Sequence, residues 1–281
     1  MHDDALDPLV TLLHGRRVCA LTGAGISTAS GIPDYRGPLT RAKARNPIQH
    51  RAFVTDPEAR QRYWARSVIG WPRFRAFEPN PAHHALTALE ARGALAGLLT
   101  QNVDRLHHKA GSRDVIELHG ALHAARCLAC GGLEDRDALQ SRLLAYNPGA
   151  DQRRHALAPD GDADLDPGMW AGFVVPGCLR CDGVLKPDVV FFGDNVPRGR
   201  VEDAMGRVDA AEVLLVVGSS LAVFSGYRFV LRAAARGIPV ALVNLGESRG
   251  DAHATVRLEA PAAEVLPALA LALGVVGGAG R

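Results

Sequence analysis

The sequence lacks the long apolar runs and the one-sided charge that mark several classes of protein. No stretch of its 281 residues reaches the roughly 18 consecutive apolar residues that a membrane-spanning helix requires. The N-terminus, MHDDALDPLV, is acidic and has no basic segment ahead of an apolar one, so we expect no secretory signal. The net charge of +2 argues against a dedicated nucleic-acid binder, which usually carries a marked basic excess. We therefore expect a cytoplasmic protein that contacts neither membrane nor nucleic acid.

Cysteine is also scarce, but its placement is informative. Four of the five cysteines form two C-x-x-C pairs, which are Cys127 with Cys130 and Cys178 with Cys181. In a chain without a signal peptide, two such pairs favour a metal over disulfides, and four thiolates complete a closed tetrahedral site for one structural zinc ion. Redox pairs are the alternative. Cys19 lies in an apolar run, and we expect it to be a small core residue.

Apolar runs that end in glycine predict a parallel sheet. RRVCALTGAGIS and AEVLLVVGSSLAV each have the form of a buried strand that enters a glycine turn. The second run is followed by FSGYRFVLRAAARG, which has helical spacing, and then by the strand-like IPVALVNLG. This succession is a βαβ unit, so we predict an α/β fold with a Rossmann-like parallel sheet. Residues 37–79 and 123–184 interrupt the pattern, and we expect them to form a smaller inserted domain.

The segment GAGIS at residues 23–27 has the glycines of a phosphate-binding turn. Glycines after a strand let the backbone approach a pyrophosphate at the N-terminus of the following helix. The dinucleotide fingerprint G-x-G-x-x-G is incomplete, because Thr28 stands at the third glycine and no acidic residue closes a second strand about 20 residues later. The chain is therefore no standard dehydrogenase. A tight turn without a ligand is the alternative.

Two later strand ends carry polar groups that could replace the missing parts. Gly218, Ser219 and Ser220 follow one strand, at the end where open α/β sheets bind ligands. Asn244 follows the next strand and could hydrogen-bond a ribose hydroxyl. A helix N-cap for the serines and a simple turn for residues 244–246 are the alternatives.

Histidines and amides gather after two further apolar segments. His119 follows the strand-like VIEL and precedes a glycine, where an imidazole can have a pKa suited to proton transfer. A packed or solvent-facing role is the alternative. Gln101, Asn102 and Asp104 follow another apolar run in the segment TQNVDRLHH. Four other histidines are interpreted as structural or solvent-facing: His83, His84, His107 and His108.

Taken together, these residues resemble the sirtuins, the NAD-dependent protein-lysine deacylases. The resemblance runs in one order over nearly the whole chain, through GAGISTASGIPDYRG, TQNVDRLH, LHG, the two C-x-x-C pairs, KPDVVFFGD, GSSLAV and VNLG. RQRYWARSVIGWP, NPAHHAL, APDGD and SGYRF are most similar to class II, the group that contains the mitochondrial lipoamidase-type sirtuin, and we expect a bacterial member. The family fold implies a large Rossmann-like NAD-binding domain at residues 1–36, 80–122 and 185–281. Its smaller domain would combine a helical module at 37–79 with a zinc-binding module at 123–184.

The resemblance implies that NAD binds along three groups of residues. The pyrophosphate and nicotinamide side would be lined by Gly23, Ala24, Gly25, Ser27, Asp34, Tyr35 and Arg36. The nicotinamide end and its ribose would be held by Gln101, Asn102, Val103 and Asp104. The adenosine half would be held by Gly218, Ser219, Ser220, Asn244, Leu245 and Gly246. Ala262 would lie near the adenine, where relatives often have a cysteine.

The same resemblance implies the chemistry. Loss of nicotinamide leaves an electrophilic ribose, which the acyl-lysine carbonyl oxygen captures, and His119 then acts as general base on a ribose hydroxyl. The products would be free lysine, nicotinamide and O-acyl-ADP-ribose. The substrate peptide is expected to pair as an added strand between the GSSLAV segment and Val190, Phe191, Phe192 and Gly193.

The preferred acyl group is the open question. Tyr63 and Arg66 have the Y-x-x-R spacing with which desuccinylating sirtuins hold an acidic acyl tail, and residues three apart share one helix face. A packed tyrosine and a solvent-facing arginine are the alternative. Residues 146–170 could reach over the acyl channel. We predict a preference for longer or acidic acyl groups, of the glutaryl or methylglutaryl type, over acetyl. The competing functions are mono-ADP-ribosyl transfer to a protein and NAD sensing without turnover, and we expect a monomer.

Overall fold

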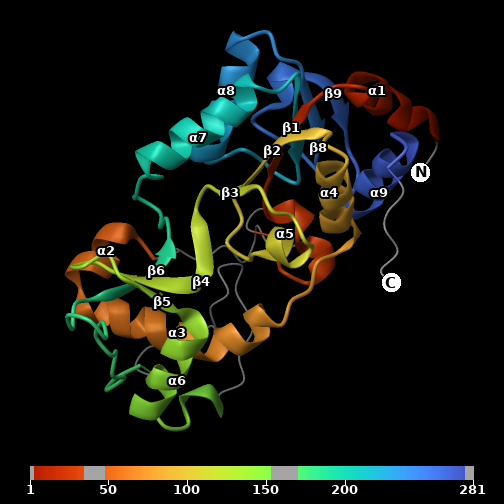
Figure 1. The fold of residues 1–281 in the computed structure, drawn as a ribbon. Coiled ribbons are helices and arrows are strands. Elements are labelled where there is room, and N and C mark those ends of the chain that lie inside the picture. Colours follow the sequence, from red (N-terminus) through yellow and green to blue (C-terminus); the bar gives the residue numbers. More distant parts are fainter. Residues whose placement is uncertain (1–2, 35–47, 153–169, 276–281) are drawn as a thin grey trace. The chain divides into compact units, whose positions relative to one another are not determined.

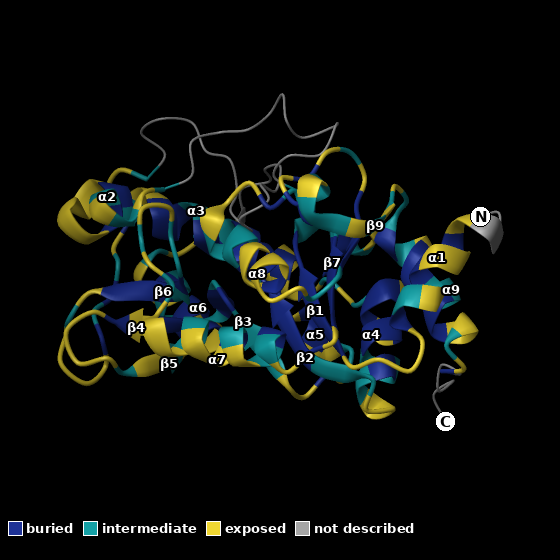
Figure 2. Ribbon diagram, turned by 90° about the horizontal axis from the view of Figure 1, so that it is seen from above, coloured by how far each residue is buried: buried dark blue, intermediate teal, exposed yellow. Residues whose placement is uncertain are grey.

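The computed structural model describes residues 3–34, 48–152 and 170–275, and the chain divides into two compact units. Unit 1 contains Met1–Ala44, Glu78–Leu118 and Val196–Arg281. Unit 2 contains Arg45–Phe77 and His119–Asn195. Figure 1 labels most of the helices and strands of both, and Figure 2 also labels β7.

Unit 1 is built on a parallel sheet of six strands in the order β3-β2-β1-β7-β8-β9. The strands are β1 (Val18–Thr22), β2 (Leu95–Thr100), β3 (Val115–Glu117), β7 (Val213–Val217), β8 (Val240–Val243) and β9 (Ala254–Leu258). The central strands β1 and β7 are buried along their whole length, as the dark ribbons of Figure 2 show. Continuous apolar runs are typical of parallel strands that are covered on both faces. The predicted Rossmann-like sheet is therefore confirmed.

Helices cover both faces of this sheet. They are α1 (Asp3–Leu13), α4 (Pro81–Ala91), α5 (Leu106–Lys109), α7 (Arg198–Asp209), α8 (Phe224–Ala235) and α9 (Ala262–Ala272). Successive side chains of a strand point to opposite faces. Accordingly, Val18 and Ala20 pack with α1, α4 and α9, whereas Cys19 and Leu21 pack with α7 and α8. Figure 1 shows these two sets of helices on opposite sides of the strands.

The strand order of unit 1 reverses between β1 and β7. From β1 the chain proceeds to β2 and β3 on one side, and it later builds β7, β8 and β9 on the other. Ligands of open α/β sheets bind at such a switch point, outside the carboxyl ends of the strands. The residues that directly follow β1 and β7 are those of the GAGIS and GSSLAV segments. The fold thus brings both glycine segments to one edge of the sheet.

Unit 2 combines a three-stranded antiparallel sheet, in the order β5-β4-β6, with helices. Its elements are α2 (His50–Thr55), α3 (Pro57–Arg75), β4 (Gly120–Cys127), β5 (Leu133–Asp135), α6 (Arg136–Tyr146) and β6 (Leu185–Val189). The side chain of Asp56 accepts the Glu58 backbone N–H, and Pro57 occupies the first helical position, so α3 begins with a strong cap. The core lies between α3, α6 and the sheet, where Trp64 and Leu139 are buried.

The compact units differ in extent from the domains expected from the sequence. Unit 2 also contains residues 119–122 and 185–195, which the sequence assigned to the large domain. The physical reason is strand pairing, since β4 begins at Gly120 and β6 pairs with it in antiparallel register. The residues on either side of the expected insertion, at the start of β4 and in β6, therefore belong to one small sheet.

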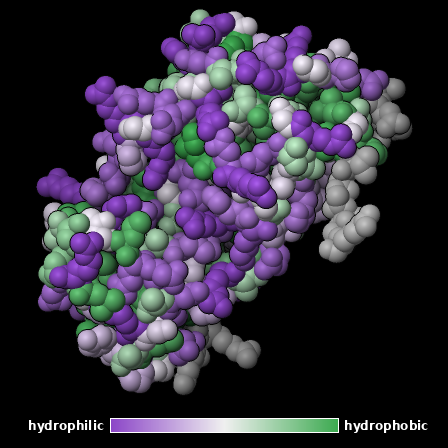
Figure 3. Space-filling view, in the orientation of Figure 1, coloured by the Kyte–Doolittle hydropathy of each residue, from purple (hydrophilic) through white to green (hydrophobic). Residues whose placement is uncertain are grey.

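Hydrophilic residues predominate on the face shown in Figure 3, with smaller groups of hydrophobic residues between them. The exposed large apolar side chains include Leu128 and Leu179, one in each C-x-x-C segment. Within the described ranges, no helix combines the length and the hydropathy needed to cross a membrane.

Candidate active site

The two glycine segments of unit 1 are in backbone contact. The Gly23 N–H donates to Val217 O at 3.0 Å, and the Gly25 N–H donates to Gly218 O at 2.8 Å. A Cβ on Gly25 would lie 2.9 Å from Gly218 Cα, and a Cβ on Gly218 would lie 2.4 Å from Ile26 N. Gly218 also has a φ of +60°, which favours glycine. The GAG and GSS segments therefore form one joined turn structure. A side chain in place of Gly25 or Gly218 would force the two segments apart.

The polar residues after β2 bind this joined turn. The Gln101 amide donates to Ser219 Oγ at 2.8 Å, and the Asn102 amide donates to Gly23 O and to Ser27 Oγ, each at 3.1 Å. The Ser27 hydroxyl in turn donates to Asp104 Oδ2 at 2.7 Å. The structure thus brings together side chains from the ends of three neighbouring strands. Val103, between them, is half-buried.

Asp104 is almost fully buried, and its surroundings are polar. Its Oδ1 accepts the Leu106 backbone N–H at 2.9 Å, while Oδ2 accepts the Ser27 hydroxyl. Burial raises the pKa of this carboxyl, and the hydrogen bonds that it accepts act in the opposite direction. Asp104 therefore fixes the direction of the Ser27 hydroxyl.

Gly226 is a residue of this site that the sequence interpretation missed. It lies in the first turn of α8, and a Cβ there would lie 2.4 Å from Gln101 Oε1. The available signal was a glycine inside a helical pattern, which costs helix stability and therefore indicates a close approach. Gln101 is thus enclosed by Ser219 on one side and by the helix backbone on the other.

Two of the histidines expected to be scaffold are buried beneath the site. Thr22 Oγ1 lies 2.9 Å from His107 Nε2, and the rings of His83 and His107 are 4.9 Å apart. Burial lowers the pKa of His83 to about 4 and lowers that of His107 well below its ordinary value. Both rings are therefore neutral near pH 7, which fits a structural role. His84 and His108 are exposed.

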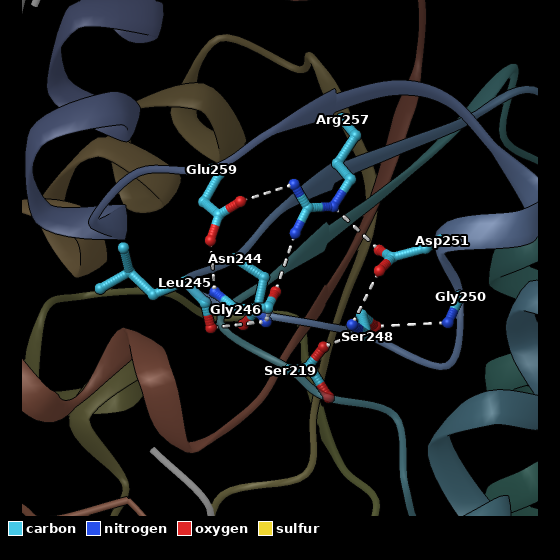
Figure 4. Close-up of polar contacts among 9 residues, drawn as sticks. All are labelled: Ser219, Asn244, Leu245, Gly246, Ser248, Gly250, Asp251, Arg257 and Glu259. Atoms are coloured by element: carbon cyan, nitrogen blue, oxygen red, sulfur yellow. Dashed lines mark hydrogen bonds and ion pairs between the residues drawn. The ribbon is translucent and has the colours of Figure 1, made fainter. Parts of the chain in front are cut away.

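The expected adenosine-side residues lie at the ends of β7 and β8 (Figure 4). The Ser248 hydroxyl donates to Ser219 O at 3.0 Å and thereby links the two loops. Asn244 is buried, and its amide donates to Leu245 O and to Gly246 O, each at 3.1 Å. Helix α8 begins at Phe224 with Val223 as its N-cap, so neither Ser219 nor Ser220 caps it.

The other four expected NAD residues differ in how they are placed. Ala262 is buried at the start of α9, in the core cluster that also contains Ile26 of the GAGIS segment. Asp34 is half-buried. Tyr35 and Arg36 lie outside the described residues.

In unit 2, His119 is joined to the expected peptide-binding segment, residues 190–193. Its carbonyl oxygen accepts the Val190 N–H at 2.8 Å. The next residue, Gly120, has a φ of +76°, and a Cβ there would lie 2.0 Å from Asp188 O, so the two backbones touch. His119 is half-buried at this junction. Only glycine after the histidine permits this approach.

The 190–193 segment is held at its far end by α2. The His50 N–H donates to Phe192 O at 2.9 Å, and the His50 ring lies 3.1 Å from Asp194 Oδ2. Lys186 Nζ also lies beneath the segment, 4.6 Å from the Phe191 ring centroid and 3.9 Å from Asp194. Phe192 and Gly193 are exposed. The segment follows the end of β6 and is held at Phe192 by one isolated parallel bridge to Gln49.

The residues expected at the acyl group are differently exposed. Tyr63 is buried, with its ring centroid 5.4 Å from that of Phe53 and 5.5 Å from that of Phe191. Arg66, on the same helix, is half-buried. Most of the 146–170 segment, residues 153–169, lies outside the described residues.

The four cysteines of the two C-x-x-C pairs gather in unit 2. Their sulfur atoms all lie within 4.8 Å of one another. The Cys130 and Arg180 backbone N–H groups point at the sulfurs of Cys127 and Cys178, at 3.5 and 3.4 Å. Four clustered sulfurs with N–H donors fit a thiolate zinc centre. Four protein ligands fill the tetrahedral coordination of zinc, so no coordination position stays open for a catalytic water or substrate. The cluster can hold one structural zinc ion.

Comparison with known proteins agrees with these features. The Sir2 family model matches residues 23–225. The chain is 54% identical over 251 residues to an NAD-dependent protein deacetylase of Xanthomonas axonopodis pv. citri (strain 306), covering 89% of this chain and 86% of that one. It is 49% identical over 265 residues to the mitochondrial NAD-dependent protein lipoamidase sirtuin-4 of Bos taurus, covering 93% and 84%.

Solved structures show the same fold. A Sir2 complex with a p53 peptide and NAD+ superposes with a TM-score of 0.78 at 30% sequence identity. The match covers 96% of this chain and 99% of that one.

Proposed function

We propose that this chain, which belongs to the Sir2 family, is an NAD-dependent protein-lysine deacylase. The observation that carries the proposal is the convergence of Gln101, Asn102 and Asp104 on the joined GAG and GSS turns. Such a polar set at the switch point of a parallel sheet suits a dinucleotide. Free lysine, nicotinamide and O-acyl-ADP-ribose would be the products.

We expect three groups of residues to hold different parts of NAD. The joined turn at residues 23–27 and 218–220 would hold the pyrophosphate through its backbone N–H groups. Gln101, Asn102 and Asp104 would hold the nicotinamide end, with Val103, Asp34, Tyr35 and Arg36 beside it. Asn244 to Gly246 and Ala262 would hold the adenosine half. When bound, NAD would supply ADP-ribose as the acceptor of the acyl group.

His119 is the proposed general base. Its imidazole would accept the proton of a ribose hydroxyl, so that the hydroxyl oxygen can attack the acyl carbon. The bond from its carbonyl oxygen to Val190 N–H fixes the histidine to the segment that we expect to pair with the peptide backbone. One contact would thus align the base with the substrate strand.

A panel of acyl-lysine peptides, incubated with NAD and analysed by mass spectrometry, tests this function. We expect stoichiometric nicotinamide and O-acyl-ADP-ribose from the wild type and from the control variant His108→Ala, which changes an exposed histidine. His119→Ala should lose at least about 100-fold in rate, the usual contribution of a general base. Equal rates for the wild type and His119→Ala would contradict the assignment.

We also propose that acidic acyl groups are preferred over acetyl. The support is that the Tyr63 ring contacts Phe191 of the peptide-binding segment, with Arg66 one helical turn further along α3. Arg66→Met should lower the ratio of glutaryl to acetyl turnover. Arg62→Met is the matched control, since Arg62 is an exposed residue of the same helix. An unchanged ratio in Arg66→Met would exclude this specificity.

The competing functions give different results in the same assay. Mono-ADP-ribosyl transfer would add ADP-ribose to the peptide and would not depend on His119. NAD sensing would give binding without release of nicotinamide. A cytoplasmic location and a monomeric state stay predictions, which fractionation and light scattering would test.

A further inference from the structure

A charged network from β9 holds both backbone groups of Gly246 (Figure 4). Glu259 Oε1 accepts the Gly246 N–H at 3.1 Å, and the Arg257 guanidinium donates to Gly246 O at 2.9 Å. Gly246 has a φ of +77°, so the turn that it forms needs external support to keep one geometry. This support comes from Arg257 near the end of β9 and from Glu259, the residue that directly follows this strand.

Arg257 is the centre of the network. Its Nε donates to Asp251 Oδ1 at 3.1 Å and its Nη1 donates to Glu259 Oε2 at 3.0 Å. Asp251 also accepts the Ser248 N–H at 3.0 Å through its other oxygen. A planar guanidinium can hold several acceptors in fixed directions, which an ammonium group cannot do. One partly exposed side chain therefore ties together the turn after β8, the Asp251 segment and the end of β9.

The network determines which atom Asn244 presents to a ligand. The Asn244 amide nitrogen donates to Leu245 O and Gly246 O, and Arg257 holds that same Gly246 oxygen. With its donor group used on the backbone of the turn, Asn244 has its Oδ1 acceptor for a ligand. An acceptor in this position recognises a hydroxyl, which donates, and disfavours the doubly ionised phosphate that predominates at neutral pH, because that group has only acceptor oxygens. The Glu259 carboxylate, bonded to the same turn, adds a negative charge that repels a phosphate.

We propose that Arg257 and Glu259 are positioning residues that fix the Asn244–Gly246 turn for the adenosine ribose and make the site select a ribose with a free 2′-hydroxyl over a 2′-phosphorylated one. The inference rests on the proposed function only in placing the adenosine half of NAD at this turn. Neither residue is proposed to touch the reacting atoms.

Calorimetric binding of ADP-ribose and 2′-phospho-ADP-ribose tests the proposal without any turnover. Arg257→Met should weaken ADP-ribose binding about five- to tenfold, because a charge-assisted bond to the turn is lost. Arg257→Lys should recover part of this loss. Arg232→Met is the matched control, since Arg232 also forms a paired contact with a carboxylate, that of Asp209 on α7 at 2.8 and 2.7 Å, and its ADP-ribose affinity should equal that of the wild type.

The ratio of the two affinities separates a positioning role from a general loss of structure. Glu259→Gln keeps an acceptor for the Gly246 N–H but removes the negative charge. The ratio of the affinity for ADP-ribose to the affinity for 2′-phospho-ADP-ribose should therefore fall about tenfold. Arg257→Met leaves the carboxylates of Asp251 and Glu259 without their cation. In that variant the ratio of the affinity for ADP-ribose to that for 2′-phospho-ADP-ribose should stay the same or rise. Amide hydrogen exchange at residues 244–246 should quicken in Arg257→Met in the ligand-free protein.

Unchanged affinities and an unchanged ratio in both variants would overturn the inference. A wild type that binds neither nucleotide would also overturn the inference, and it would contradict the proposed function as well. If the wild type binds ADP-ribose but deacylates no peptide, the proposed function fails while the binding ratios still decide the inference.

Discussion

Mild acid should destabilise unit 1 through His83. This residue is fully buried in the first turn of α4, and its Nδ1 accepts the Asn80 backbone N–H, so the ring is held neutral. Burial lowers its pKa from 6.5 to about 4. As the pH falls below 6.5 the unfolded chain therefore binds the proton first, and the free energy of unfolding decreases until the folded state is also protonated near pH 4.

The expected loss is large on the scale of domain stability. A shift from 6.5 to about 4 removes about 2 kcal/mol between pH 7 and pH 5, and about 3 kcal/mol by pH 4. Whole domains are typically stable by only about 5–15 kcal/mol. The lowered pKa of His107 acts in the same direction, whereas the raised pKa of Asp104 acts in the opposite one. A comparison of variants is therefore needed to isolate His83.

The variant His83→Gln makes this comparison. Glutamine at this position of a capping box can still accept the Asn80 N–H but has no titration in this range. Urea unfolding at pH 7, 6 and 5 should show that the variant loses about 2 kcal/mol less than the wild type over that interval. His84→Gln, on the exposed side of the same turn, is the control. Parallel stability profiles of the wild type and His83→Gln would refute the reasoning.

Three other substitutions have defined outcomes. Cys178→Ser should abolish stoichiometric zinc, measured by elemental analysis, because a closed site needs all four ligands. Gly226→Ala should raise the KM for NAD about tenfold with little change in thermal midpoint, since its Cβ would displace Gln101; an unchanged KM would contradict the close approach. Arg136→Met should lower the free energy of unfolding by about 2–3 kcal/mol in urea titrations, because Arg136 is buried and donates to Ser67 and Gln140; an unaltered unfolding midpoint would count against that role.

Features that depend on short segments were predictable from the sequence. The strand before GAGIS and the strand before GSSLAV were visible because each is a continuous apolar run stopped by glycine. The two C-x-x-C pairs predicted a four-sulfur cluster, since each pair supplies two ligands from one tight turn, and their sulfurs do gather. In each case the pattern lies within a few residues, so local chemistry was sufficient.

Features that depend on pairing between distant segments could not be predicted in the same way. The contact of Thr22 with His107 joins residues far apart in sequence, and nothing in either segment indicates that the histidine is buried. Arg257 and Glu259 look like ordinary surface charges at a strand end, and their bonds to Gly246 follow only from the register of β8 and β9. The placement of residues 185–195 in unit 2 likewise follows from the pairing of β6 with β4.

The backbone contact between the GAG and GSS segments has a consequence for how the protein is synthesised. Gly25 is translated early and Gly218 late, so their hydrogen bond joins parts of the chain that leave the ribosome far apart in time. The switch point between β1 and β7 cannot exist on a nascent chain that has not reached β7, and such long-range pairing is slow to form. We therefore expect that truncated or stalled chains have no nucleotide affinity, and that dinucleotide binding reports completion of the sheet.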